Sequence, residues 1–154
     1  MLHSLRQREI QVRRIKVIGI GSALRKDDSI GLRLADSISV EEIDQSESSC
    51  DLSLLYALEG YDTAVIIDAV DFGGKAGETR IMRAEDLPKN PNETHSMDLG
   101  FILGIMNLLE SSPDVFVFGV QPADLGFGDS LSEALSMALP GIKRRLEEFV
   151  KSLM

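Results

Sequence analysis

Residues 64–70 read AVIIDAV, the most apolar of the stretches with strand character, and they decide the fold class. Their short length and β-branched side chains indicate a β-strand. Because the apolar run is almost unbroken, both faces of this strand should be buried, as in parallel sheets with helices on each side. The stretch therefore predicts an α/β protein. The acid within it, Asp68, is the first candidate for a functional residue.

Strands and helices are predicted to alternate along the rest of the chain. Residues 15–21 (IKVIGIG) and 115–120 (VFVFGV) are apolar runs of the same kind, and a weaker strand is expected over 40–44. In residues 79–83, Thr, Ile and Arg alternate with Arg and Met, which is typical of an edge strand with one polar face. Apolar positions at helical spacing predict helices over residues 30–38, 51–58, 96–109 and 130–153.

Local signals mark where these elements begin and end. Asp27 and Asp28 precede the first helix, and aspartate is a favourable N-cap. Ser130 and Glu133 form an S-x-x-E capping box for the final helix. Pro140 lies inside that helix and is expected to kink it. Polar residues, glycines and prolines predict loops over residues 45–50, 71–77 and 85–94.

Alternation with short connections predicts a three-layer α/β/α fold with a doubly wound, mostly parallel sheet. The strand over 79–83 is the expected antiparallel edge. A chain of 154 residues without a repeat or linker should form one domain over residues 1–154. Residues 1–14, which carry several arginines, are expected to lead into the first strand.

Composition excludes several classes of function. The net charge of -9 opposes nucleic-acid binding, because phosphate contacts need clustered lysines and arginines. Since Cys50 is the one cysteine, the chain can form neither an internal disulfide nor a CxxC metal site. No apolar run approaches the roughly 20 residues that span a bilayer, and residues 1–14 lack the apolar core of a signal peptide. We therefore expect a cytoplasmic protein that does not insert into membranes.

Candidate functional residues lie at the ends of the predicted strands, because functional groups of open α/β sheets gather at the carboxyl ends. Asp28 follows the first strand, Asp68 lies near the end of the third, and His95 precedes a buried helix. A carboxylate inside an apolar strand is costly unless it is paired or binds a metal ion. Other polar residues and a proline at strand ends are Ser22, Arg25, Asp27, Gln121, Pro122 and Asp124.

Each candidate also has a purely structural interpretation. Asp68 would then accept backbone N–H groups from a nearby helix start, and His95 would be a hydrogen-bond partner at its own helix start. One of Asp27 and Asp28 would interact favourably with the dipole of the helix start, and the other would face the cleft.

If Asp28, Asp68 and His95 converge, they form an open metal site. Two carboxylates and an imidazole suit zinc, nickel, cobalt or manganese, and the remaining positions would take water or substrate. An ion held there would polarise a peptide carbonyl or lower the pKa of a bound water. The spacing indicates such a site without showing that the three loops meet.

Two other sites are weaker hypotheses. Gly19-x-Gly21 after a strand is similar to the start of a dinucleotide-binding G-x-G-x-x-G, but Leu24 stands where the third glycine belongs, and two acids follow it. A Cys50–His95 hydrolase has no motif around the cysteine, whose commoner role is that of a small buried residue.

Four blocks of the sequence, in this order, resemble the nickel-iron hydrogenase maturation endopeptidases. They are VIGIGSALRKDDSIGLRLAD (17–36), VIIDAVDFGGKAGE (65–78), THSMDLG (94–100) and VFGVQPADLGFGDSLSEAL (117–135). The resemblance extends along nearly the whole chain, from Ile15 to about Leu146. Each block is weak by itself, whereas four in the family's order are fairly specific.

The resemblance implies an α/β/α hydrolase that removes a short C-terminal extension from the large-subunit precursor of a nickel-iron hydrogenase. It implies Asp28, Asp68 and His95 as both the catalytic and the metal-contacting residues. The ion would be nickel, supplied by the substrate, although another divalent metal would fit the same donors. The expected partner is the precursor, and the expected state is a monomer.

One residue departs from the family pattern, because Ser22 stands where asparagine usually follows G-x-G. Serine offers fewer hydrogen bonds, so the loop that carries Asp28 would be held differently. This departure leaves open a second hypothesis, that the chain is a catalytically impaired escort protein that only binds hydrogenase. A third hypothesis is a flavodoxin-like cofactor-binding module.

Overall fold

The computed structural model describes the backbone of residues 13–88, 94–110 and 112–154, and the side chains of all of these except 94–98. Most of the expected lead-in over residues 1–14 therefore lies outside the described residues. In the described part of the chain, no helix is both long enough and apolar enough to cross a membrane.

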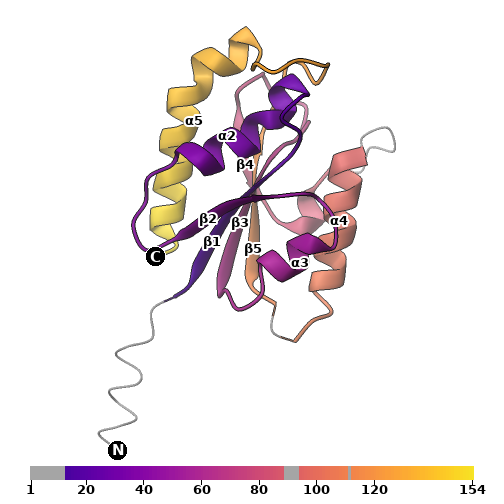
Figure 1. Ribbon diagram of the computed structural model, residues 1–154, viewed down its shortest axis with the longest axis vertical. Coiled ribbons are helices and arrows are strands. Elements are labelled where there is room, and N and C mark those ends of the chain that lie inside the picture. The colour runs from indigo at the N-terminus through magenta and orange to yellow at the C-terminus, as the bar shows by residue number, and fades with distance from the viewer. Residues whose placement is uncertain (1–12, 89–93, 111) are drawn as a thin grey trace, which may run out of the picture.

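A twisted sheet lies at the centre of the molecule (Figure 1). Over the described residues it has five strands in the order β2-β1-β3-β5-β4. These strands are β1 Ile15–Ile20, β2 Asp44–Ser48, β3 Thr63–Ala69, β4 Thr79–Met82 and β5 Asp114–Val120. The pairs β1–β2, β1–β3 and β3–β5 are parallel, whereas β4 is antiparallel to β5. The predicted mostly parallel sheet with an antiparallel edge strand is confirmed.

Helices cover both faces of the sheet and give three layers (Figure 1). One layer contains α2 (Ile30–Ser37) and α5 (Glu133–Ser152), and the opposite layer contains α3 (Ser53–Ala57) and α4 (Thr94–Met106). Short 3₁₀ turns, η1 (Lys26–Ser29) and η2 (Ala84–Asp86), follow β1 and β4. The α/β/α fold class is therefore confirmed.

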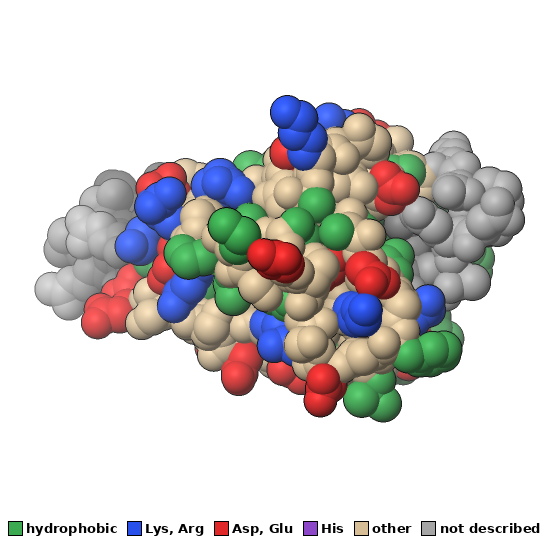
Figure 2. All heavy atoms as spheres, turned by 90° about the horizontal axis from the view of Figure 1, so that it is seen from above, with side chains coloured by type: hydrophobic (Ala, Val, Ile, Leu, Met, Phe, Trp, Pro, Cys, Tyr) green, Lys and Arg blue, Asp and Glu red, His purple; other side chains and the backbone are tan. Residues whose placement is uncertain are grey.

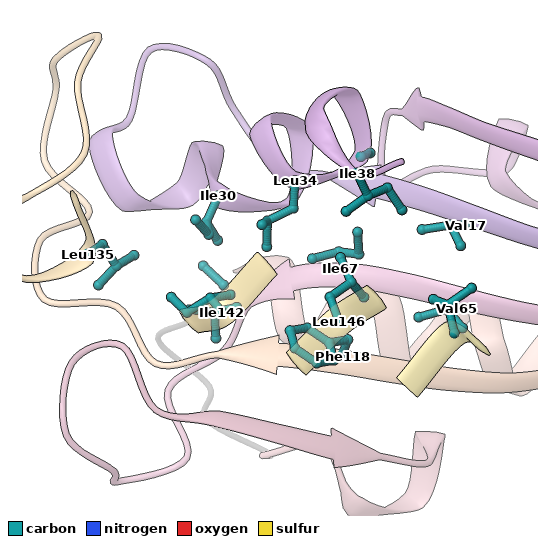
Figure 3. Close-up of a cluster of buried hydrophobic side chains, with 14 residues drawn as sticks. Val17, Ile30, Leu34, Ile38, Val65, Ile67, Phe118, Leu135, Ile142 and Leu146 are labelled. Carbon is teal, nitrogen blue, oxygen red and sulfur yellow. The ribbon is translucent and has the colours of Figure 1, made fainter. Parts of the chain in front are cut away.

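The central strand β3 is buried along its whole length. Val65 and Ile67 face the layer of α2 and α5, and Figure 3 shows them packed with Phe118, Leu146 and other side chains of that core. Ala64 and Ile66 belong to the second core, on the side of α3 and α4. Burial on both faces explains why the strand reads as a continuous apolar run.

The predicted position of the second strand was wrong. A strand was expected over 40–44 and a loop over 45–50, whereas β2 covers Asp44–Ser48. Its sequence, DQSES, has no apolar periodicity, because β2 is an edge strand with largely exposed side chains. Residues 44–48 form a strand because their backbone pairs with β1. Such pairing cannot be predicted from the pattern of side chains.

Both predicted helix caps also need correction. Asp27 and Asp28 lie inside η1, and Ser29 is the N-cap residue of α2 without a side-chain capping bond. Ser132, not Ser130, caps α5, and its hydroxyl accepts the backbone N–H of Leu135. Ser132 is also held at the helix start by Asp27, which accepts its N–H and its hydroxyl.

Smaller differences concern Pro140 and the loop over 85–94. Pro140, where a kink is predicted, lies inside α5, and the helix continues past it to Ser152. The predicted loop over 85–94 includes most of η2, and α4 begins at its end, with Thr94.

Helix α2 packs against β1 and β3 with almost no side chain between the backbones. A Cβ added to Gly31 would overlap the carbonyl oxygen of Ile67 and lie 2.5 Å from that of Ile20. A Cβ on Gly19 would overlap the carbonyl of Gly31. Glycine at these positions lets α2 sit directly on the strands, and this brings the preceding turn η1 into contact with β3.

We predict that Gly31→Ala lowers the free energy of unfolding by about 1–3 kcal/mol, because the added methyl group must push α2 away from the sheet. Urea denaturation measures the change. Gly104→Ala is the matched control in α4, since its Cβ would meet nothing within 4 Å. That variant should be more stable by about 0.5–1 kcal/mol. Equal stability of the Gly31 variant and the wild type would contradict the close packing of α2.

Candidate active site

Two of the elements that carry candidate residues, η1 and β3, meet at the carboxyl edge of the sheet. Turn η1, with Asp27 and Asp28, follows β1 and contacts β3. Asp68 is the penultimate residue of β3. Figure 1 shows the start of α2 and the β5–α5 connection at this same upper end of the molecule.

Asp68 is completely buried, as the sequence predicts. It lies opposite Gly119 of β5 in the sheet register. Side chains alternate along a strand, so Asp68 shares its face with Ala64 and Ile66, which belong to the core beside α3 and α4. Its carboxylate is therefore on the side of the sheet that α4 covers.

Asp28 is buried as well, with only 3% of its surface exposed. Its Oδ2 accepts the backbone N–H of Ser22 at 3.0 Å. Gly21 allows this tight return of the chain: its φ is +135°, and an added Cβ would overlap the carbonyl oxygen of Asp28. The contact uses the backbone of residue 22, so it does not depend on whether that residue is serine or asparagine.

Asp27 has a different role, because its carboxylate joins two distant loops. It is fully buried. Oδ2 accepts the N–H groups of Ala123 and Asp124 at 2.8 and 2.9 Å and the Ser132 hydroxyl at 2.8 Å, and Oδ1 accepts the N–H of Ser132 at 2.8 Å. Asp27 thereby ties the loop after β1 to the β5–α5 connection. Of the two acids, Asp27 is the structural one.

An ion pair strengthens the same junction at the surface. Lys26 donates to the carboxylate of Asp124 at 2.9 Å. This hydrogen bond and the paired charge raise the pKa of Lys26 and lower the pKa of Asp124, so both stay ionised around neutral pH. Because both side chains are well exposed, the pair adds little to stability.

Gln121 holds the loop that follows β3. Its Oε1 accepts the N–H groups of Phe72 and Gly74 at 2.9 and 3.0 Å, and its Nε2 donates to Asp71 at 3.0 Å. The bond from Gln121, together with one from the Gly73 N–H, lowers the pKa of the Asp71 carboxyl. An ionised carboxylate is therefore fixed three residues after Asp68.

The third predicted ligand cannot be placed in the site. His95 lies in the first turn of α4, but its side chain is outside the described residues. Across the side chains that the structure does describe, no group of three His, Cys, Asp or Glu residues could hold a metal ion. The convergence of Asp28, Asp68 and His95 stays a prediction. The backbone places α4, which carries His95, on the face that Asp68 occupies.

Other candidates have structural positions. Cys50 follows β2 and packs against the core beside α3 and α4, as expected of a small apolar residue. Leu24 is 68% exposed at the rim of the site. The role of Ser132 was missed, because a serine before a helix looks the same in sequence whether or not a distant acid binds it.

The comparisons with known proteins concern the family and the fold. A family model described as hydrogenase maturation protease matches residues 49–148. The matched segment contains Asp68 and His95, and it leaves out Asp28.

Curated relatives match at low identity. Hydrogenase expression/formation protein HupD of Bradyrhizobium diazoefficiens is 28% identical over 128 residues, which cover 75% of this chain and 66% of that protein. Hydrogenase 3 maturation protease of Escherichia coli is 31% identical over 84 residues, which cover 54% and 53%. The match thus spans about two thirds of the first relative's length and about half of the second's.

Solved structures share the fold. Hydrogenase maturating endopeptidase HybD of E. coli has a TM-score of 0.75 at 24% identity, over 90% of this chain and 93% of that one. The [NiFe] hydrogenase maturation protease HycI of Thermococcus kodakarensis KOD1 has a TM-score of 0.69 at 22% identity, over 96% and 99%.

We predict that Asp27→Ala lowers the free energy of unfolding by about 3 kcal/mol or more, because it leaves several buried N–H groups without an acceptor. Asp27→Asn should lose less, since its amide keeps one acceptor oxygen. Asp36→Ala, on the exposed face of α2, is the control and should change stability by less than about 0.5 kcal/mol. If urea unfolds the Asp27→Ala variant and the wild type at the same midpoint, Asp27 does not hold the junction.

Proposed function

Since the chain belongs to the hydrogenase maturation protease family, we propose that it is an endopeptidase acting on the large-subunit precursor of a nickel-iron hydrogenase. It removes a C-terminal extension once nickel is in the precursor. The observation that carries this proposal is the pair of buried acids, Asp28 and Asp68, on neighbouring elements at the carboxyl edge of the sheet. Functional groups of open α/β sheets gather at this edge, which supports a role for the two acids in the reaction.

The two acids suit hydrolysis of a peptide bond. A carboxylate that is held in place and shielded from bulk water can orient a water molecule and accept its proton as that water attacks the scissile carbonyl. The Ser22 N–H binds one oxygen of Asp28, and strand β3 holds the backbone of Asp68 in the sheet. A nucleophilic serine or cysteine is not needed for this reaction.

The same acids fit a divalent ion as ligands. Together with an imidazole nitrogen from His95, these carboxylate oxygens would make a donor set that suits nickel, zinc, cobalt or manganese. In the proposal the ion is the precursor's own nickel, which its cysteines hold and present. Bound at the edge, nickel would polarise the peptide carbonyl. A precursor without nickel lacks this contact and is not cut.

The structure weakens the arguments for an escort protein and for a cofactor-binding module. The escort hypothesis depends on Ser22, yet the contact from residue 22 to Asp28 uses the backbone. The cofactor-binding hypothesis needs a phosphate at the start of α2, where Asp27 and Asp28 are buried. We further propose that the enzyme works in the cytoplasm as a monomer.

We predict that Asp68→Asn reduces precursor cleavage at least about 100-fold while the protein stays folded, because the amide keeps the shape but is a poor base and ligand. The rate of appearance of processed large subunit measures the loss, and circular dichroism reports the fold. Asp36→Asn, on the exposed face of α2, should cleave like the wild type. Normal cleavage by the Asp68 variant would make this acid purely structural.

We also predict that nickel is required on the precursor and not on the free enzyme. Few protein donors are available, so the enzyme's own site should bind metal weakly. Chelator-treated enzyme, mixed with nickel-loaded precursor in metal-free buffer, should cleave at the normal rate. The idea is wrong if cleavage returns only when metal is restored to the enzyme, or if nickel-free precursor is cut equally well.

A further inference from the structure

Large apolar side chains stand exposed on both loops that form the rim of the candidate site. Leu24, in the loop after β1, is 68% exposed, and Phe127, in the β5–α5 connection, is 88% exposed. Figure 2 looks down onto this edge of the molecule, where hydrophobic side chains lie exposed among acidic and basic ones. Neither Leu24 nor Phe127 contributes to the hydrophobic cores.

Backbone hydrogen bonds hold the two segments side by side. The N–H of Gly128 donates to the carbonyl of Leu24 at 3.0 Å, and the N–H of Lys26 donates to the carbonyl of Gly128 at 3.1 Å. Gly128 has a φ of +154°, and an added Cβ would lie 3.0 Å from the Lys26 side chain. This bridge fixes the backbone next to both apolar side chains.

Arg25 connects the bridge to the aromatic ring. Its Nε donates to the carbonyl of Leu125 at 3.1 Å, and its guanidinium lies 5.9 Å from the centre of the Phe127 ring. Leu24, Arg25 and Phe127 together are called the rim patch below. Beneath it, the buried carboxylate of Asp27 ties the same two segments together.

A rim patch of this kind has the properties of a protein-binding hot spot. Phenylalanine and arginine are enriched in protein interfaces, and arginine is among the residues that contribute most to binding energy. Because the backbone is already fixed, little conformational entropy would be lost when a partner covers the patch. Exposure of both residues on one rigid bridge therefore distinguishes the patch from apolar residues scattered singly over a surface.

We propose that the rim patch docks the folded body of the hydrogenase large-subunit precursor, so that the scissile segment reaches Asp28 and Asp68. The proposal rests on the proposed function. Leu24 is four residues before Asp28, and Ser22 of the same loop donates its N–H to the Asp28 carboxylate, so the patch and the candidate site share one loop. The partner surface should be apolar, with a carboxylate placed to meet Arg25, since the neighbouring Lys26 is already paired with Asp124.

The test uses Leu24→Ser and Phe127→Ser, separately and together, with the full-length enzyme. Each variant is assayed for cleavage of nickel-loaded precursor and, separately, for precursor binding by calorimetry. The double variant should raise KM and the dissociation constant at least about tenfold, with kcat changed less than about twofold. Its thermal midpoint should match the wild type, because neither side chain is buried.

Leu108→Ser is the matched control. Leu108 is 82% exposed, and it follows α4 at the opposite edge of the sheet, far from the candidate site. This variant should leave KM, kcat and binding unchanged. Phe127→Leu, which keeps an apolar side chain, should restore most of the affinity that Phe127→Ser loses.

The outcomes separate this inference from the proposed function. If the wild type cleaves the precursor and the double variant has the same KM and affinity, the rim patch is not the docking surface and the enzyme assignment stands. If the wild type binds without cleaving and the double variant does not bind, docking holds and the protease function fails. Equal weakening by Leu108→Ser, or no binding by the wild type, overturns the docking proposal.

Discussion

The buried carboxylate of Asp27 organises the functional edge of this molecule. It is bonded to the backbone of the β5–α5 connection and to Ser132, whose hydroxyl also caps α5. The loop after β1, the loop after β5 and the start of the last helix are thus joined at one side chain. An acid that satisfies several backbone donors costs far less to bury than one that satisfies none.

The neighbouring acid, Asp28, has a different hydrogen-bond partner. Asp28 is bound by the Ser22 N–H, and its turn η1 contacts β3, the strand that carries Asp68. The close approach of α2 at Gly31 sets how near η1 lies to the strand. The exposed side chains of Leu24 and Phe127 lie on the same two joined segments.

Much of the fold follows from sequence pattern. The strand containing Asp68 reads as buried on both faces because it is central in the sheet, and the alternation of elements then predicts the layers. β2 could not be located, since its edge position leaves no apolar pattern. Strand-end reasoning and the family resemblance predicted a site at Asp28 and Asp68, and both acids are buried. The separate role of Asp27 could not be predicted, because it depends on residues about a hundred positions away in sequence.

The central claim is that this chain shortens a hydrogenase large-subunit precursor. Its most direct test is the intact mass of nickel-loaded precursor after incubation with the purified wild-type protein. We expect one new species, lighter by the mass of a C-terminal segment, together with the released peptide. A precursor whose mass is unchanged, under conditions in which a known maturation protease cleaves its own substrate, would contradict the account.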